Sequence, residues 1–424
     1  MDQKYLSDTR QLLNYIMLSP SPFHAVAMAA SELESMGFVP LDERKPFAVK
    51  RGGSYYIKRN SSALIAFRIP SSFSGFHIAS AHTDSPCLKI KWNPEIKSEG
   101  FPTRLNVETY GGLLLQSWFD RPLSIAGRVF VKRNGDVEEK LVNLGQKMTL
   151  VIPNLAIHQN RDANNGWKIS VQKEMLPIFS DGDASFLDEL ASSAECRKED
   201  LLDYDLFLYN KTAPTFWGAD GEFFSSPKID DLGCVWSALE ALKTSTPKDK
   251  IAMCAFFDNE ETGSGTKQGA LSDFLLSVTE RIMENLGFGV EEKYMAYANS
   301  RMISADNGHA VHPAWKEKSD VTNLPRMNKG VLLKYSASQK YTTDAESGAY
   351  VRNLMDKNNI PYQIFHNNSD VAGGSTLGNL SGQKVSIRTC DVGVAQLAMH
   401  SSYESAGTKD TNALISLFAS FFKE

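Results

Sequence analysis

Histidine and carboxylate side chains recur directly after short apolar segments of this 424-residue chain. They are His82 and Asp84 after residues 77–81, Glu260 and Glu261 after residues 251–257, Asp306 after residues 302–305, and His400 after residues 397–399. Two further acids, Asp230 and Asp231, open an otherwise apolar segment that is typical of a helix. Because loops converge at the carboxyl ends of the strands of an α/β sheet, we expect these side chains to meet in one site.

The residue types in this set favour a hydrolytic metal site. They are histidines, aspartates and glutamates without cysteine, which suits catalytic Zn²⁺, Mn²⁺ or Co²⁺ better than a structural zinc site. Two ions roughly 3.5 to 4 Å apart would need one bridging carboxylate and further ligands on each flank. Each residue alone also has a plain structural explanation, since Asp230 and Asp231 could simply cap a helix. Their recurrence at strand ends is what indicates a metal site.

Apolar periodicity places these residues in an α/β fold. Strands are predicted at residues 55–57, 63–67, 77–79, 251–257, 302–303, 331–333, 362–365 and 385–387. Helices are predicted near residues 5–16, from His24, at 231–243, 271–282 and 345–357, and at the C-terminal end to Phe422. This alternation predicts a central mixed sheet flanked by helices on both faces.

Residues 91–225 interrupt the alternation with short strand-like runs and turn signals. Asn134-Gly135 follows the apolar residues 129–131 and is a strong signal for a two-residue β-hairpin. We therefore expect residues 1–90 and 226–424 to form one domain, into which residues 91–225 are inserted as a mostly β domain.

Composition narrows the function classes. The chain has 45 Lys and Arg against 50 Asp and Glu, a formal charge of -5 and no long basic run, so nucleic acid is not expected as a partner. The five cysteines are scattered without a Cys-x-x-Cys pair, which favours a reducing cytoplasm. The N-terminal residues lack the apolar core of a signal peptide, and no apolar run approaches the roughly 18 residues of a membrane span. We expect a cytoplasmic protein that is not embedded in a membrane.

Five ordered motifs resemble those of the aspartyl aminopeptidases, the M18 family of dinuclear zinc exopeptidases. The motifs are SPSPFHA at residues 19–25, AHTDSP at 81–86, DNEExGS at 258–264, SADxxHAVHP at 304–313 and QLAMHS at 396–401, where x is a position that the resemblance leaves open. They extend over essentially the whole chain, so the resemblance implies the zinc exopeptidase type of α/β fold throughout the proposed main domain.

The resemblance implies a metal ligand set. His82 and Asp306 would hold the first zinc, Asp230 would bridge, and Glu261 with His400 would hold the second zinc. Zn²⁺ is the expected metal at both sites, with Mn²⁺ and Co²⁺ as alternatives.

The same resemblance implies roles around the metals. Glu260 would be the general base, and Asp84 would support the imidazole of His82 from behind. One departure concerns Asp231, where family members often carry Asn. Asp231 could therefore be the bridge in place of Asp230.

The resemblance further implies a substrate and an assembly. Peptides with a free N-terminus would lose an N-terminal Asp or Glu, with attack by a zinc-bridging water and with His309 and Lys334 recognising the acidic side chain. The insertion would mediate dimerisation, and dimers would assemble into a homododecamer in which His158 reaches a neighbouring active site.

Two other functions remain open. A related dinuclear zinc hydrolase could have leucine-type preference or could remove N-acyl groups, because the pocket and not the metal cluster selects the side chain. A self-assembling shell or cargo-binding scaffold with a vestigial site is the alternative of another class. The intact set of ligands beside Glu260 argues against it.

Overall fold

The computed structural model describes residues 3–371 and 373–424, which divide into two units. The first unit contains the chain up to Asp84, Pro214–Met399 and Glu404–Glu424, and the second contains Ser85–Ala213 and His400–Tyr403. The insertion expected at residues 91–225 therefore corresponds to a unit that begins and ends several residues earlier and includes a short segment near the C-terminus.

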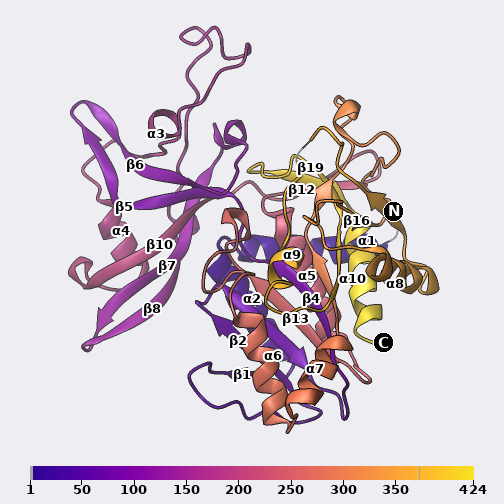
Figure 1. The fold of residues 1–424 in the computed structure, drawn as a ribbon. Coiled ribbons are helices and arrows are strands. Elements are labelled where there is room, and N and C mark those ends of the chain that lie inside the picture. Colours follow the sequence, from indigo (N-terminus) through magenta and orange to yellow (C-terminus); the bar gives the residue numbers. More distant parts are fainter. Residues whose placement is uncertain (1–2, 372) are drawn as a thin grey trace. The chain divides into compact units, whose positions relative to one another are not determined.

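A nine-stranded mixed sheet forms the centre of the first unit (Figure 1). Its order is β1 (Val39–Leu41), β2 (Ser54–Arg59), β3 (Ala63–Arg68), β13 (Ile251–Phe257), β4 (Phe76–His82), β14 (Arg301–Ala305), β18 (Arg388–Gly393), β16 (Val331–Lys334) and β17 (Tyr362–Phe365). Strands β13, β4, β14 and β18 are parallel neighbours, whereas β3 runs antiparallel to β13 and β16 runs antiparallel to β18. Every residue of β4 and β13 is buried, which explains their continuous apolar sequence.

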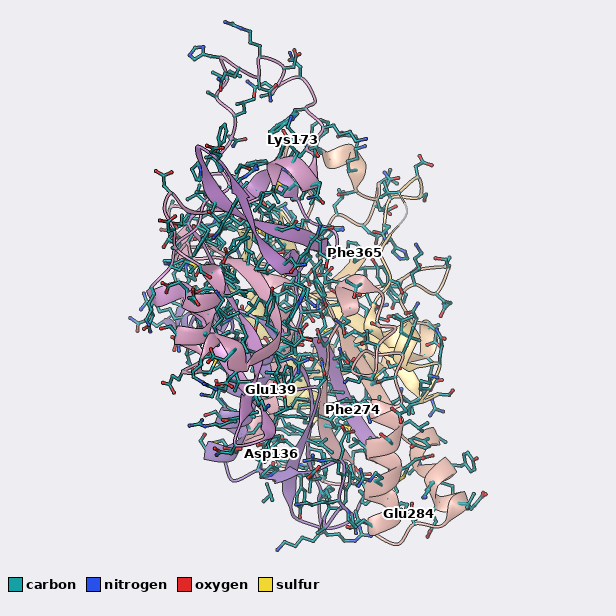
Figure 2. All side chains as sticks on the ribbon, turned by 90° about the vertical axis from the view of Figure 1, so that its left-hand side faces the viewer. Asp136, Glu139, Lys173, Phe274, Glu284 and Phe365 are labelled. Atoms are coloured by element: carbon teal, nitrogen blue, oxygen red, sulfur yellow. The ribbon has the colours of Figure 1, made fainter. Side chains whose placement is uncertain are left out.

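Helices cover both faces of this sheet. One layer contains α1 (Gln3–Leu18), α2 (Pro22–Ser35), α5 (Ile229–Thr244), α8 (Ala345–Lys357) and α10 (Asp410–Phe421), and the other contains α6 (Phe274–Asn285), α7 (Val290–Ala298) and α9 (Leu377–Ser381). Successive strand residues alternate between the layers: Leu64 packs with the first and Ile65 with the second. Phe274 is fully buried at the start of α6, whereas Glu284 in its last turn is exposed (Figure 2). The expected α/β architecture is confirmed.

A smaller five-stranded sheet belongs to the same unit. Its order is β11 (Thr215–Trp217), β12 (Phe223–Ser226), β20 (Glu404–Gly407), β19 (Ala395–Leu397) and β15 (Gly308–His309). It brings the segment after Asp306 beside β19, which pairs in turn with β20.

The second unit is mostly β. Its six-stranded sheet has the order β8 (Asp136–Asn143), β7 (Leu123–Arg133), β10 (Leu201–Asn210), β5 (Cys87–Ser98), β6 (Phe101–Tyr110) and β9 (Ile178–Ser180), with helices α3 (Val171–Glu174) and α4 (Phe186–Ser193). Asn134 and Gly135 join β7 to β8 with φ values of 53° and 90°, as a type I′ turn requires. The hairpin prediction is confirmed.

The structure differs from the predicted elements at three places. Residues 385–387 are not a strand, because the Val385 amide still bonds to the Ser381 carbonyl at the end of α9, and β18 begins only at Arg388. Leu271 lies in a turn before α6, and α7 was not predicted. Among the described helices, none is both long enough and apolar enough to cross a membrane.

Candidate metal centre

Three neighbouring parallel strands deliver most of the predicted site residues. His82 is the last residue of β4, Asp306 directly follows β14, and Glu260 and Glu261 lie in the 3-10 turn Glu260–Thr262 after β13. His82 pairs in register with Phe257, the last residue of β13. The carboxyl ends of these strands therefore lie at one edge of the sheet, where the start of α5 adds Asp230 and Asp231.

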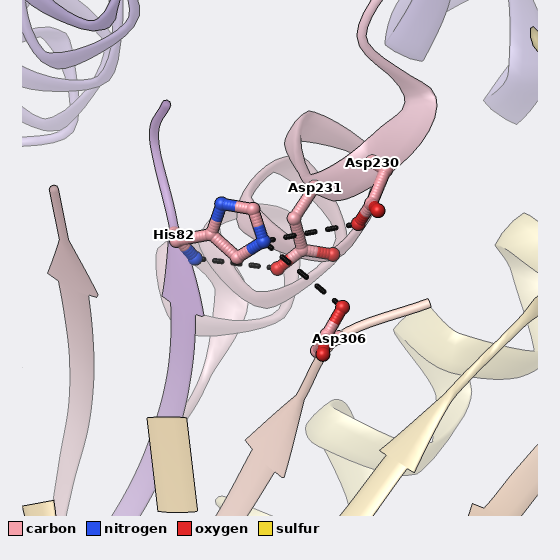
Figure 3. Close-up of side chains that lie close together, drawn as sticks. All are labelled: His82, Asp230, Asp231 and Asp306. Carbon is pink, nitrogen blue, oxygen red and sulfur yellow. Dashed lines mark hydrogen bonds and ion pairs between the residues drawn. The ribbon is translucent and has the colours of Figure 1, made fainter. Parts of the chain in front are cut away.

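The two ring nitrogens of His82 face different partners. Nε2 lies 3.8 Å from Oδ1 of Asp230 and 4.0 Å from Oδ1 of Asp306 (Figure 3). Nδ1 lies 3.3 Å from Oδ1 of Asp84. Atoms bound to one zinc at about 2.0 to 2.2 Å cannot be more than about 4.4 Å apart, so Nε2 and the two aspartates are spaced for a shared ion.

The carboxylates around His82 form overlapping groups. Potential ligand atoms of His82, Asp230, Asp231 and Asp306 all lie within 4.8 Å of one another, and so do those of His82, Glu260 and Glu261. Oxygens of Asp230 and Glu261 also lie within 4.8 Å. Asp230 is therefore close both to the His82 and Asp306 pair and to Glu261.

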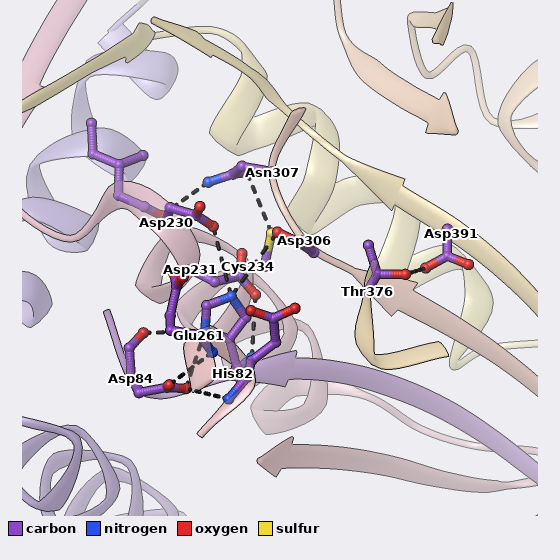
Figure 4. A network of polar contacts seen from close by, with 12 residues as sticks. His82, Asp84, Asp230, Asp231, Cys234, Glu261, Asp306, Asn307, Thr376 and Asp391 are labelled. Carbon is purple, nitrogen blue, oxygen red and sulfur yellow. Dashed lines mark hydrogen bonds and ion pairs between the residues drawn. The ribbon is translucent and has the colours of Figure 1, made fainter. Parts of the chain in front are cut away.

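Asp84 holds three parts of the site together. Its Oδ1 accepts a hydrogen bond from the backbone N–H of Glu260 and its Oδ2 accepts one from Glu261, both at 3.2 Å (Figure 4). The same carboxylate faces Nδ1 of His82. Sequence reasoning assigned Asp84 only to His82, and the structure adds the backbone of the two glutamates.

Asp231 is completely buried beside the bridging candidate. Its Oδ2 accepts a hydrogen bond of 3.2 Å from the backbone N–H of His82. Its Oδ1 is buried and accepts no hydrogen bond from the residues that the structure describes. A buried carboxylate oxygen of this kind is completed well by a cation.

The crowding of acids shifts their protonation. Burial raises the pKa of Glu260 to about 8; the positive charge of His82 opposes this rise, and the charge of Asp306 adds to it. Burial likewise raises the pKa of Asp231 well above its usual range. Burial alone would lower the pKa of His82, but Asp231 and Asp84 outweigh it and raise this pKa well above its ordinary value. Carboxylate oxygens and an imidazole that favour positive charge this strongly are suitable ligands for divalent metal ions.

The two predicted recognition residues have different surroundings. Lys334 is buried, and its Nζ lies 3.4 Å from Oδ2 of Asp306 and donates to the backbone carbonyls of Asp306 at 2.9 Å and Asn307 at 3.0 Å. Burial would lower the pKa of Lys334, but Asp306 raises it, so the ammonium group is charged. His309 is exposed at the end of β15.

Two predicted residues belong to the second unit. Nδ1 of His400 lies 2.8 Å from the carbonyl oxygen of Gly112, which belongs to the same unit. His158 is exposed in the loop after Ile152. Their assignments as a metal ligand and as a residue of a neighbouring site stay predictions.

Sequence reasoning missed a set of buried polar residues behind the site. Asn307, Gln396 and Glu404 form hydrogen bonds to one another and to the backbone beside Asp230. Gln396 is the first residue of a recognised motif, which was a usable signal, and Asn307 directly follows the predicted ligand Asp306. No sequence motif marked Glu404, because only the fold brings it to Asp230.

Comparison with known proteins settles the family. The family model of the aminopeptidase I zinc metalloproteases (M18) matches residues 15–422, nearly the whole chain. The chain belongs to the M18 family. This M18 protein is a metallo-aminopeptidase and thus a hydrolase, as the resemblance of its motifs predicted.

Relatives and solved structures agree with this assignment over most or nearly all of their lengths. The M18 chain is 43% identical over 428 residues to a probable M18 family aminopeptidase 2 of Clostridium acetobutylicum, covering 98% of this chain and 99% of the relative. A cryo-EM structure of an Ape4 and Nbr1 complex superposes with a TM-score of 0.95 at 32% identity, covering 99% and 86% of the two chains. The structure of the S. cerevisiae mApe1 dodecamer superposes with a TM-score of 0.87 at 26% identity, and the match covers 97% of this chain and 95% of that chain.

Proposed function

We propose that this M18 aminopeptidase releases an N-terminal Asp or Glu from peptides with the help of two divalent metal ions. The observation that carries the acidic preference is the buried, charged Lys334 beside the ligand candidate Asp306. The preference would come from residues around the metal ions, because the proposed metal ligands would serve an aminopeptidase of any side-chain preference.

The proposed ligands divide between two ions. His82 with Asp306 would hold one ion, Glu261 with His400 the other, and Asp230 would bridge. The bridge is assigned to Asp230 because it lies close to both groups, whereas Asp231 already uses Oδ2 on the backbone N–H of His82. When bound, the two ions, zinc in the family description and Mn²⁺ or Co²⁺ as alternatives, would lower the pKa of a shared bridging water and polarise the peptide carbonyl.

The chain's own residues would move the proton. Glu260 would accept a proton from the attacking water and pass it to the leaving amine. Burial brings the pKa of this carboxyl from its ordinary value to about 8, near neutral pH, which suits a group that takes up and returns a proton. Asp84 fixes the backbone of Glu260, and His158 of a neighbouring subunit would donate a hydrogen bond to the developing oxyanion.

The acidic side chain of the substrate would be recognised by charge. A carboxylate taken out of water needs a cation or several donors, and a charge-assisted hydrogen bond meets this need. Lys334 is a cation that the fold keeps buried next to the candidate ligand Asp306, and its ammonium group already donates to Asp306 and Asn307, so it would attract the substrate carboxylate through its charge. The exposed His309 follows Asp306 by three residues. Together they would favour Asp and Glu over Leu.

Replacement of Lys334 tests this preference. Lys334→Leu should lower release from Asp and Glu chromogenic amides about 10- to 100-fold more than release from the Leu amide, since an attraction of about 1.5 to 3 kcal/mol between the ammonium charge and the substrate carboxylate is lost. Lys316→Leu, at an exposed lysine, is the control. Metal content must be measured in parallel, because Lys334 also contacts Asp306. Equal losses on acidic and apolar substrates would overturn the preference and leave the metallo-aminopeptidase assignment intact.

The chain is also proposed to assemble. The mApe1 structure is a dodecamer, and the β-rich second unit of this chain exposes large apolar side chains such as Phe101 and Ile157. We propose a homododecamer built from dimers in which this unit makes the dimer contact.

A further inference from the structure

A chain of buried polar side chains connects the segment of Asp230 with the segment of Asp306. Asn307, Gln396 and Glu404 are 3%, 1% and 2% exposed, so they are shielded from bulk water. Nδ2 of Asn307 donates to Oε1 of Gln396 at 3.0 Å, and Nε2 of Gln396 donates to Oε1 of Glu404 at 3.3 Å. We call these three residues the polar relay.

The two ends of the polar relay hold the same peptide group. Nδ2 of Asn307 donates to the carbonyl oxygen of Ile229 at 3.0 Å, and Oε2 of Glu404 accepts from the backbone N–H of Asp230 at 3.0 Å. This carbonyl and this N–H belong to one peptide bond, the one that precedes the proposed bridging carboxylate. Figure 4 shows Asn307 reaching toward the backbone beside Asp230. The peptide plane cannot rotate without breaking both bonds.

The Asn307 amide is itself fixed in orientation. Its Oδ1 accepts hydrogen bonds from the backbone N–H of Val394 at 3.3 Å and from the thiol of Cys234 at 3.5 Å. Its backbone carbonyl accepts from Lys334, which also contacts Asp306. Asn307 therefore ties the neighbouring ligand candidate Asp306 to the peptide group of Asp230.

The stability of the fold alone would not require these buried polar side chains. A buried carboxylate such as that of Glu404 is costly to desolvate, and apolar side chains of similar volume would fill the same space at least as well. Second-layer hydrogen bonds that orient metal ligands, by contrast, commonly change metal affinity 10- to 100-fold when they are removed.

We propose that the polar relay positions Asp230 between the two metal ions by fixing its peptide plane relative to Asp306. Asn307, Gln396 and Glu404 are positioning residues, since none of them belongs to the proposed ligand set. This inference rests on the dinuclear site of the proposed function.

The direction of the hydrogen bonds supplies a sharp test. Glu404→Gln places an NH₂ group where the polar relay needs an acceptor, so a donor faces the N–H of Asp230 or the amide of Gln396. The double variant Glu404→Gln with Gln396→Glu restores every bond: Gln at 404 accepts from Asp230 and donates to Glu at 396, which accepts from Asn307. Volume is nearly unchanged in each variant.

The experiment titrates chelator-treated full-length protein with Zn²⁺ alone, following binding by calorimetry and bound zinc by elemental analysis. Glu404→Gln should weaken zinc binding about 10- to 100-fold, and the double variant should recover most of the parental affinity. Cobalt loaded into the same samples should change its visible absorption in the single variant and regain the parental spectrum in the double variant.

Asp410→Asn is the matched control. Asp410 is an equally buried acid that accepts backbone hydrogen bonds, from Asn328 and Gly330, away from the metal candidates. It should lower the melting temperature of the metal-free protein and leave zinc affinity unchanged. Parental zinc affinity in Glu404→Gln, or a double variant as weak as the single one, would overturn the inference. A parent that binds fewer than two zinc ions per chain would instead overturn the dinuclear proposal. If Glu404→Gln does not fold, Gln396→Glu alone is titrated against the double variant and must be the weaker binder.

Discussion

At the scale of the residue, the site separates proton transfer from metal binding by small differences of position. Glu260 and Glu261 are adjacent, and both backbone N–H groups bond to Asp84. Oxygens of Glu261 and Asp230 lie within 4.8 Å of each other, which suits Glu261 as a ligand beside the bridge. Glu260 has a pKa raised to about 8 by burial, which suits a proton carrier.

This separation predicts that replacing Glu260 lowers turnover without releasing metal. Glu260→Gln should lower turnover by about 10² to 10⁴ and leave the metal content at the parental value, because a general base is not a ligand. Steady-state rates and elemental analysis of the same preparation measure both quantities. Loss of an ion from Glu260→Gln would mean that the roles of Glu260 and Glu261 are exchanged.

At the scale of the element, strand β4 carries a second histidine whose surroundings are quite different. His77 is 4% exposed, its Nδ1 lies 2.7 Å from the Phe421 carbonyl oxygen of α10, and its ring stacks on Phe421. Burial lowers the pKa of His77 to about 4. Because the folded-state pKa lies below the unfolded value of about 6.5, its contribution to stability is complete above pH 6.5 and is lost as the pH falls toward 4.

Protonation of His77 should therefore make the free energy of unfolding depend on pH. Between pH 7 and pH 5 its contribution should fall by about 2 kcal/mol, so the melting temperatures of the parent and His77→Gln should approach each other as the pH is lowered. Thermal unfolding at pH 7, 6 and 5 measures this difference, with the exposed His312→Gln as the control. A difference that stays constant over this range would contradict the assignment.

The elements also show what sequence patterns can and cannot reveal. Continuous apolar runs predicted β13 and β4, and polar residues directly after them marked the site, because burial on both faces leaves a strong pattern. Residues 385–387 misled the prediction, since β-branched residues also fill the turn after α9. Asp231 as acceptor for His82, and Glu404 as acceptor for Asp230, follow from three-dimensional packing that no local pattern encodes.

At the scale of the whole molecule, the second unit exposes several large apolar side chains. Trp92, Phe101, Val137, Leu155 and Ile157 are all exposed by about half or more. Apolar surface of this kind commonly marks a contact with another chain. The proposed assembly would cover it.

Charges placed in this surface should disrupt the assembly. Leu155→Asp combined with Ile157→Asp should give particles of lower mass by light scattering, and activity should fall with the mass because His158 would no longer reach a neighbouring site. His158→Phe should instead keep the parental mass and lose activity. Parental mass in the double Asp variant would remove this loop from the proposed contact.

The central claim is that two metal ions and an acidic side-chain pocket act in one aminopeptidase site. The most direct test strips the full-length protein with chelator and restores Zn²⁺ stepwise, measuring bound zinc and the release rates from Asp and Leu amides in each sample. A dinuclear site with an acidic pocket predicts no release without metal, activity that rises until two ions are bound per chain, and faster release of Asp than of Leu throughout. Activity that persists without metal, or that is complete at one ion, would contradict the dinuclear site, and faster release of Leu would contradict the acidic pocket.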